Sequence, residues 1–213
     1  MKIKEIVWDW NGTLVDDAFL CVEILNDILV NFDQSPISIK YYRNNFSFPV
    51  SDFYQRISLP YDGNEFEEVS LNFISNYRKQ WKRCKLQPSA RQVLKMVHGR
   101  GLDQTILSAA KQSDVEIYTD HFELTSFFSK VIGTDNIKAE GKIDLGKNFL
   151  LDSNLQPEEI LLIGDTFHDL EVANEIGCSA LLYSRGHNSK IQLSRCKCGK
   201  IDDLKEVVQY LHR

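Results

Sequence analysis

The sequence predicts an α/β protein with a parallel sheet flanked by helices and a small α-helical cap. From residue 88 onward, short apolar runs of strand length alternate with segments of helical periodicity. This alternation is typical of parallel sheets that are covered by helices on both faces. Between residues 17 and 87 the chain is instead helical and aromatic. That segment therefore interrupts the alternation directly after the first strand.

The elements before residue 88 follow from composition and spacing. Residues 3–8 are apolar, β-branched and aromatic, as in a buried strand. Residues 16–31 carry apolar side chains at helical spacing, which predicts a helix. Ser35 followed by Pro36 predicts a second helix start, with Ser35 as the N-cap. Helical sequence then continues to about residue 85, with proline-containing breaks at residues 48–49 and 59–63.

Strands and helices alternate in the second half. Strands are expected where short aliphatic runs occur, at residues 104–107, 131–133, 160–163 and 180–183. Helices are expected at residues 91–100, 113–121, 143–151, 169–176 and from about 202 to the end. Gly101 and Gly177 follow two of these helices and are interpreted as C-cap glycines.

The pattern predicts two parts. Residues 1–16 and 88–213 form a Rossmann-like α/β core, and residues 17–87 form the helical cap. A length of 213 residues fits one main domain with a sizeable insertion. Ligands of such cores bind at the carboxyl ends of the strands. Asp9, Ser108 and Asp165 all fall at predicted strand ends.

Composition excludes several classes of protein. A net charge of -5 and a pI near 5.6 argue against nucleic acid as the main partner. No apolar run approaches the roughly 18 residues of a membrane span, and no cleavable signal is evident. Five scattered cysteines suit a reducing compartment. We expect a cytoplasmic protein, and the sequence does not indicate its oligomeric state.

Two acidic clusters follow predicted strands. In the first, Asp9 is followed by Gly12 and Thr13, so that a carboxylate and a hydroxyl can approach a phosphorus atom closely. In the second, Asp165 and Asp169 can hold a hard cation through oxygen ligands. A strand-ending turn and an acidic helix N-terminus are the structural alternatives. The occurrence of both clusters at strand ends favours the functional interpretation.

Two further residues fit a phosphate site. Ser108 can donate its hydroxyl to a phosphate oxygen, although a plain loop serine is an equal alternative. Lys142 precedes a helix and can neutralise phosphate charge, although most single lysines are solvated surface residues. Lys138, four residues earlier, is a competitor for the same role.

With these segments in this order, the chain resembles the haloacid dehalogenase superfamily, in the phosphoglycolate phosphatase-like branch with a cap after the first strand. The resemblance covers nearly the whole chain. The segment from Asp9 to Leu14 resembles the first motif of the family, Ser108 the second, Lys142 the third, and residues 164–169 the fourth.

The resemblance implies a Mg²⁺-dependent phosphatase that acts on a small organic phosphate monoester. Asp9 attacks phosphorus in line and forms an aspartyl-phosphate, which water hydrolyses. Mg²⁺ is expected to be held by Asp9, the backbone carbonyl of Asn11 and Asp165, with Asp169 as a direct or water-mediated ligand. The metal offsets the repulsion between the two anions.

The same resemblance implies how the transferring group is bound. Thr13, Ser108 and Lys142 are expected to hold it, and Gly12 to border it, since positioning and charge stabilisation supply most of the catalysis. The cap is expected to close over the site and exclude bulk water.

Asn11 departs from the family pattern. Most phosphatases of this family carry a second aspartate two residues after the nucleophile, and that group protonates the leaving oxygen. An amide cannot transfer protons at neutral pH. Losing general acid–base help costs about 10²–10⁴-fold in rate.

Several interpretations of Asn11 stay open. The enzyme is slow, its substrate has a good leaving group, or His168 or a cap residue donates the proton. A phosphonate-cleaving hydrolase would need a cap lysine, for which Lys40, Lys79 and Lys82 are present. A weak or inactive phosphate-ligand binding protein is the alternative from another class, although intact Asp9 and Asp165 count against it.

Two other segments have simpler interpretations. The cap carries aromatic residues that predict either a substrate pocket or, more simply, the packed core of a small helical bundle; they are Tyr42, Phe46, Phe48, Phe53, Tyr54 and Trp81. Residues 186–189 follow the strand at 180–183 and can border the site, although a plain loop is the simpler interpretation.

Overall fold

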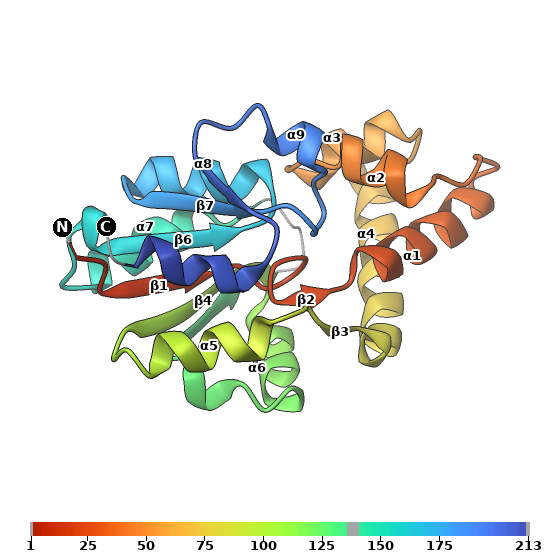
Figure 1. Cartoon of the computed structure of the whole chain (residues 1–213). Coiled ribbons are helices and arrows are strands. Elements are labelled where there is room, and N and C mark those ends of the chain that lie inside the picture. The colour runs from red at the N-terminus through yellow and green to blue at the C-terminus, as the bar shows by residue number, and fades with distance from the viewer. Residues whose placement is uncertain (1, 136–140, 212–213) are drawn as a thin grey trace.

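A parallel sheet lies at the centre of the computed structural model, which describes residues 2–135 and 141–211 (Figure 1). Within these residues the sheet has six strands in the order β5-β4-β1-β6-β7-β8, and each neighbouring pair is parallel. The predicted α/β class is therefore confirmed. The strands are β1 (Glu5–Trp8), β4 (Asp103–Lys111), β5 (Lys130–Thr134), β6 (Ile160–Gly164), β7 (Ser179–Tyr183) and β8 (Gly199–Ile201).

Helices cover both faces of the sheet. Successive side chains of a strand point to opposite faces, so each strand contributes to the packing on both sides. Ile6 and Trp8 join one buried cluster, together with side chains of α5 (Ala90–His98), α6 (Gln112–His121) and the 3₁₀ helix η4 (Leu204–Tyr210). Val7 joins another cluster on the opposite face, with side chains of α7 (Ile143–Asp152) and α8 (Phe167–Ile176). Every residue of β1 is buried, so the strand that ends at Asp9 is fixed from both sides.

Four helices lie beyond the carboxyl edge of the sheet, at the opposite end of the molecule from the described ends of the chain (Figure 1). The chain leaves the sheet through β2 (Val15–Asp16) and returns through β3 (Lys85–Leu86), which pair antiparallel. No helix in the described ranges is long and apolar enough to cross a membrane. The four helices are α1 (Ala18–Asn31), α2 (Ile39–Asn45), α3 (Val50–Arg56) and α4 (Gly63–Gln80).

The predicted helix start at Ser35 is wrong. Helix α2 begins at Ile39, and Ser38 is its N-cap, with the Ser38 Oγ accepting a hydrogen bond from the Tyr41 backbone N–H at 3.1 Å. The side chain of Asn26 binds both backbone groups of Ile37, at 2.8 and 3.1 Å. These bonds use the peptide groups that an earlier helix start would need, which explains the shift.

Other boundaries moved for local reasons. Strand β4 extends to Lys111, so Ser108 lies inside it, although the pairing with β5 shifts register after Leu107. Helix α5 ends at the C-cap Gly99, and Gly101 takes a positive φ two residues later. Helix α8 begins at Phe167, two residues before the predicted start. The C-terminal helix is a 3₁₀ helix that spans Leu204–Tyr210. The sequence did not predict several short elements, namely β2, β3, β8, η1 (Trp81–Arg83), η2 (Thr125–Phe127), η3 (Pro157–Glu159) and α9 (Lys190–Leu193).

The cap of α2 gives a direct test of the observed helix start. Ser38→Ala should lower the free energy of unfolding by about 1 kcal/mol, because it removes the acceptor of an otherwise unpaired helix N–H group. Ser35→Ala, three residues earlier and equally exposed, is the matched control and should change it by less than about 0.5 kcal/mol. Urea denaturation measures both; a larger loss for Ser35→Ala would restore the original prediction.

Candidate active site

Three aspartates come together at the carboxyl edge of the sheet. Asp9 follows β1 and Asp165 follows β6, and these strands are hydrogen-bonded neighbours. Asp169 lies in the first turn of α8, where its side chain completes a capping box with Thr166. All three are buried, and each contributes a carboxylate oxygen to a cluster whose atoms lie within 4.8 Å of one another. The two acidic clusters predicted from the sequence therefore form one site.

Lys142 connects two of these carboxylates. Its Nζ lies 2.5 Å from Asp9 Oδ1 and 2.8 Å from Asp169 Oδ1, and it also donates to the Leu107 carbonyl at 2.8 Å. Burial alone would lower the pKa of Lys142, but the charges of Asp169 and Asp9 outweigh it and raise the pKa. Burial opposes ionisation of Asp169 too, yet Lys142 holds the pKa of that carboxyl below its ordinary value.

The third carboxylate is bound differently. Asp165 accepts from the Thr13 hydroxyl at 2.7 Å and from the His187 backbone N–H at 2.6 Å. Burial, together with the charges of Asp9 and Asp169, raises the pKa of Asp165 well above its ordinary value. Burial also raises the pKa of Asp9, which Lys142 only partly offsets. The site thus holds more buried negative charge than Lys142 balances.

This donor set fits a hard divalent cation. The groups are carboxylate oxygens, which such cations prefer. Oδ1 of Asp169 is buried and makes no well-directed hydrogen bond, although the Lys142 ammonium is near. A bound cation would offset the burial and the mutual repulsion of the carboxylates that raise the pKa of Asp9 and Asp165.

Two glycines allow the backbone to approach Asp165. Gly12 has a φ of +79°, and a Cβ on it would overlap both the Asp165 carboxylate and the His187 ring. A Cβ on Gly186 would overlap the same carboxylate. These positions therefore need glycine because the loops after β1 and β7 pack directly on the acidic cluster. Gly12 is thus placed against Asp165, while its predicted contact with a phosphoryl group stays a prediction.

Asp17 and His187 form a second buried ion pair that the sequence reasoning missed. His187 Nε2 lies 3.2 Å from Asp17 Oδ1, and its Nδ1 lies 2.9 Å from the Tyr42 hydroxyl of α2. Burial lowers the pKa of His187, but Asp17 raises it more, to about 9. In turn, although burial opposes it, the charge of His187 holds the pKa of Asp17 low. The pair is therefore charged at neutral pH, and the loop at residues 186–189 borders the site.

Asn11 is bound into this network. Its amide Nδ2 donates to Asp17 Oδ2 at 2.7 Å and to the Tyr77 hydroxyl of α4 at 2.9 Å. The Tyr77 hydroxyl itself donates to Asp17 at 2.8 Å, and the Gly12 N–H to the other oxygen of Asp17 at 2.9 Å. The loop after β1 is thereby joined to the helices beyond the sheet edge.

The remaining predicted residues lie close by. Ser108 is buried and lines the same cavity as Asp9, Asn11, Lys142 and Asp169. Thr13 is fully buried and its hydroxyl is bound to Asp165. Lys138 lies outside the described residues.

His168 has a different role from the proton donor considered above. Its Nε2 accepts the Lys142 backbone N–H at 2.9 Å, and its Nδ1 lies 3.0 Å from Glu171 Oε2. A ring that accepts at Nε2 and faces a carboxylate at Nδ1 has no nitrogen left for a leaving group. A Cβ on Gly141 would overlap this ring, so His168 packs directly against the backbone that carries Lys142.

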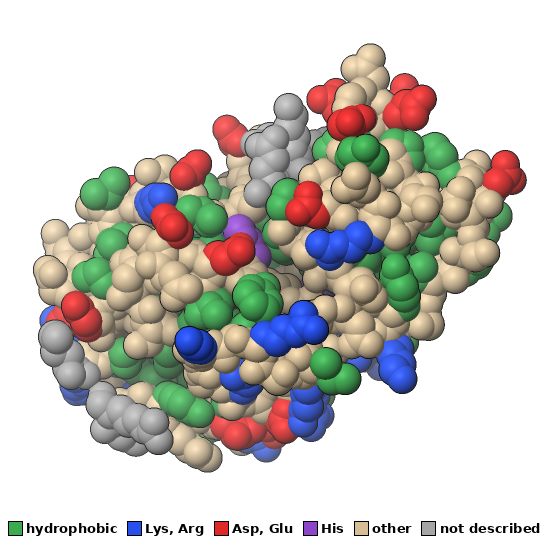
Figure 2. All heavy atoms as spheres, turned by 90° about the horizontal axis from the view of Figure 1, so that it is seen from above, with side chains coloured by type: hydrophobic (Ala, Val, Ile, Leu, Met, Phe, Trp, Pro, Cys, Tyr) green, Lys and Arg blue, Asp and Glu red, His purple; other side chains and the backbone are tan. Residues whose placement is uncertain are grey.

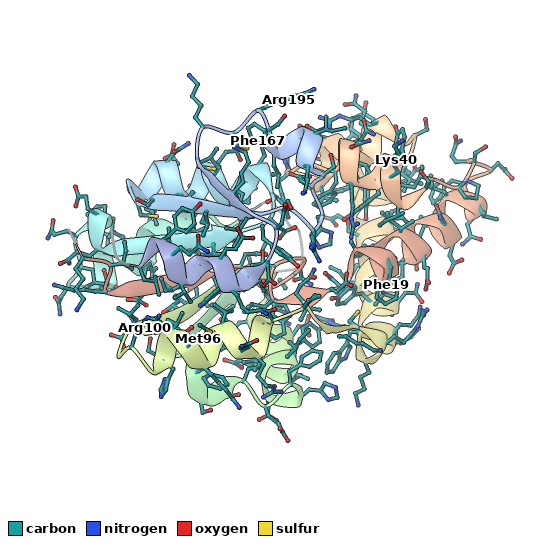
Figure 3. The ribbon with its side chains drawn as sticks, viewed as in Figure 1. Phe19, Lys40, Met96, Arg100, Phe167 and Arg195 are labelled. Atoms are coloured by element: carbon teal, nitrogen blue, oxygen red, sulfur yellow. The ribbon has the colours of Figure 1, made fainter. Side chains whose placement is uncertain are left out.

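A cavity of about 200 Å³ adjoins the acidic cluster. Figure 2 shows a narrow hollow on one face of the molecule, with histidine and hydrophobic side chains at its edge. Figure 3 shows Lys40 on α2 and Phe167 at the start of α8, and both side chains are exposed. Lys40, Lys79 and Lys82 do not line the cavity.

The aromatic residues of the helical segment serve two purposes. Tyr42, Phe53 and Tyr54 are buried in the hydrophobic core and also line the cavity. Phe46 and Phe48 are half-buried and line it as well. The interpretation that these aromatic residues only pack a bundle core is therefore incomplete for the five that line the cavity. It holds for Trp81, which is buried and is not part of the cavity wall.

Comparisons with known proteins agree with this geometry. The model of the family described as haloacid dehalogenase-like hydrolase matches residues 6–183. Phosphoglycolate phosphatase 1 of Pseudomonas aeruginosa is 23% identical over 87% of this chain and 72% of its own length. Phosphoglycolate phosphatase of Synechococcus elongatus is 24% identical over 90% of this chain and 88% of its own.

Solved structures support the fold. A predicted phosphatase from Clostridium acetobutylicum superposes with a TM-score of 0.82 at 17% identity, covering 100% of this chain and 99% of that chain. A haloacid dehalogenase-like family protein from Streptococcus pneumoniae gives a TM-score of 0.80 at 21% identity, with 98% of each chain covered.

The Asp17–His187 pair makes a testable contribution to stability. Asp17→Asn should lower the free energy of unfolding by about 3 kcal/mol, because it leaves a buried imidazolium without its partner charge. Asp16→Asn changes the neighbouring, half-buried aspartate and should cost less than about 1 kcal/mol. Urea denaturation at neutral pH distinguishes them. Equal, small losses in both variants would show that the buried pair adds nothing.

Proposed function

Because the chain belongs to the haloacid dehalogenase-like hydrolase family, we propose that it is a Mg²⁺-dependent phosphatase that hydrolyses a small organic phosphate monoester through Asp9. The observation that carries the proposal is the buried cluster of Asp9, Asp165 and Asp169 with Lys142, beside a cavity at the strand ends. The phosphoglycolate phosphatases among its relatives support a small phosphorylated metabolite as the substrate.

Asp9 is the nucleophile in this proposal. Lys142 binds Oδ1 of Asp9, which fixes the carboxylate at the cavity. A carboxylate oxygen forms a bond to phosphorus as the bond from phosphorus to the ester oxygen breaks, and the leaving oxygen departs with the electron pair as an anion that takes its proton from water. Water then cleaves the aspartyl-phosphate and releases inorganic phosphate. Ser108 and Lys142, both on the cavity wall, bind the transferring phosphoryl oxygens, with Thr13 behind them beside Asp165.

Asp9, Asp165, Asp169 and the Asn11 carbonyl would hold the Mg²⁺ ion. When bound, the ion supplies positive charge that offsets repulsion between the carboxylate nucleophile and the phosphate. Side chains of the protein position the nucleophile: Lys142 orients Asp9, and His168 fixes the backbone of Lys142.

The helices at residues 17–87 act as a cap over the core of residues 1–16 and 88–213. Two observations support this division. The chain passes from the core to the cap at β2 and returns at β3, and these two strands pair with each other. Helix α4 provides part of the cavity wall. Through Tyr77, Asn11 contacts the cap directly. The five cysteines are free thiols, which supports a cytoplasmic location, and neither nucleic acid nor a membrane is part of the proposal.

Asn11 favours one alternative, a catalytically weak or inactive phosphate-ligand binding protein. In the structure the Asn11 amide donates two hydrogen bonds, one to Asp17 and one to Tyr77. These bonds give Asn11 a structural role that needs no proton transfer. A phosphonate-cleaving hydrolase has less support, because none of Lys40, Lys79 and Lys82 lines the cavity.

Activity separates these functions. Freshly purified wild type should release phosphate from an aryl ester in the presence of Mg²⁺, and Asp9→Asn should abolish the release. Asn11→Asp should accelerate hydrolysis of simple alkyl esters by about a hundredfold, because it restores a general acid, and aryl esters less. Phosphate release is the measurement. Asn11 is followed by Gly12, a sequence prone to deamidation, so an intact-mass check excludes conversion of Asn11 to aspartate in the sample. If wild type and Asn11→Asp both bind Mg²⁺ but cleave no ester, the ligand-binding alternative holds.

Metal binding has its own test. Asp165→Asn should weaken Mg²⁺ binding by at least about tenfold, because it removes one of the three clustered carboxylates. Asp144→Asn, an exposed aspartate in the first turn of α7, is the control and should bind as wild type does. Isothermal titration calorimetry measures both affinities without relying on turnover. Equal affinities would contradict this location for the ion.

A further inference from the structure

The cavity beside Asp9 has two walls of opposite character. One is polar and contains Asp9, Ser108 and Lys142, which the proposed mechanism uses. The other is formed mainly by apolar and aromatic side chains of the cap, which the mechanism leaves unused. They are Leu25, Tyr42, Phe46, Phe48, Val50, Phe53, Tyr54, Phe73, Ile74 and Tyr77, with Tyr118 contributed by α6.

We infer that the ester hydrolysed at this site carries an apolar leaving group about the size of a single aromatic ring, as in an aryl or arylalkyl phosphate. The inference rests on the proposed phosphatase function and extends it to the substrate class. An anionic leaving group, such as the carboxylate of phosphoglycolate, is the contrasting class.

Charge on the cavity wall argues against an anionic leaving group. Lys142 is bound by Asp9 and Asp169, and His187 by Asp17. Asp114 adds a carboxylate to the wall, although Arg78 binds it at 2.7 Å. A carboxylate placed against the aromatic wall, out of reach of Lys111, would lose its hydration without gaining a charged partner, which is costly. Among the described residues that line the cavity, Lys111 is the remaining cation, and it is therefore the one to test.

The volume of the cavity fits a single ring. It measures about 200 Å³, and an apolar cavity of about 150 Å³ is enough to bind benzene. One aromatic ring joined to a phosphoryl group at Asp9 therefore fits in the cavity.

Phe48 and Ile74 form the part of the apolar wall that is best placed to contact a substrate. Both are half-buried and line the cavity, yet neither belongs to the hydrophobic core clusters. The Phe48 ring lies 4.9 Å from the His168 ring, which packs against the Lys142 backbone, so it reaches toward the phosphate-binding end.

Asn11 independently favours the aryl over the arylalkyl members of this substrate class. A phenol has a pKa of about 10 and departs as an anion far more readily than an alkyl alcohol. An aryl phosphate therefore depends least on the general acid that Asn11 cannot supply. An aryl leaving group satisfies both the apolar wall and the missing acid.

The experiment compares kcat/KM for phenyl, benzyl and ethyl phosphate and for phosphoglycolate, with Mg²⁺ present. Benzyl and ethyl phosphate and phosphoglycolate all release alkyl alcohols, so differences among them report the apolar wall more than leaving-group reactivity. Wild type should prefer benzyl phosphate over the other two by about tenfold or more. Phenyl phosphate should be faster still, because its leaving group needs no proton.

Two variants place this preference on the wall. Phe48→Ala should lower kcat/KM for benzyl phosphate by about tenfold while leaving ethyl phosphate nearly unchanged. Ile74→Lys should shift the ratio of benzyl phosphate to phosphoglycolate by about tenfold toward phosphoglycolate. Leu71→Lys, on the same helix but 53% exposed and away from the cavity, is the control and should keep the wild-type ratio.

Other outcomes overturn the inference separately from the proposed function. If wild type prefers phosphoglycolate to benzyl phosphate, the inference of an apolar leaving group is wrong while the proposed phosphatase function stands. If Lys111→Met then selectively loses this preference, Lys111 is the residue that binds the substrate carboxylate. Inactivity toward all four esters would overturn the proposed function and the inference with it.

Discussion

The site depends on the ion pairs that Lys142 makes with Asp9 and Asp169. Three carboxylates buried within 4.8 Å of one another would repel strongly, and Lys142 is the buried cation that binds two of them. Its position in turn depends on His168, which accepts the Lys142 backbone N–H. The same contact joins α7 to α8, so the acidic edge of the sheet and one of its helical layers are fixed together.

The Asp17–His187 pair extends this arrangement into the helical segment. Asp17 precedes α1, and it accepts hydrogen bonds from Asn11 and from Tyr77 of α4, while His187 contacts Tyr42 of α2. Two charged clusters therefore support one cavity: Lys142 with its two aspartates holds Asp9, the proposed nucleophile, and the Asp17–His187 pair joins the loop after β1 to α2 and α4. Asn11 belongs to the second, which gives this residue a structural role in place of proton transfer.

The parts of this arrangement that sequence reasoning found are those set by local pattern. Asp9 and Asp165 were placed correctly at strand ends because the apolar runs before them are short and unambiguous. Asp17 and His187 were missed because their pairing joins residues 170 positions apart, and each resembles an ordinary turn residue by itself. The start of α2 was misplaced for a similar reason, since the bonds that Asn26 makes to Ile37 override the Ser35–Pro36 signal. Local sequence thus located the acidic residues at the strand ends, and tertiary contacts determine how they are held.

The most direct test of the account is to trap the phosphoryl group on the chain. Protein mixed with Mg²⁺ and phenyl phosphate is quenched in acid after one turnover and analysed by peptide mass spectrometry. The account predicts a phosphoryl adduct on the peptide that contains Asp9, accumulating because Asn11 cannot act as a general base in the second step, and lower in Asn11→Asp. Release of phosphate with no adduct on Asp9, or with an adduct on another residue, would contradict it.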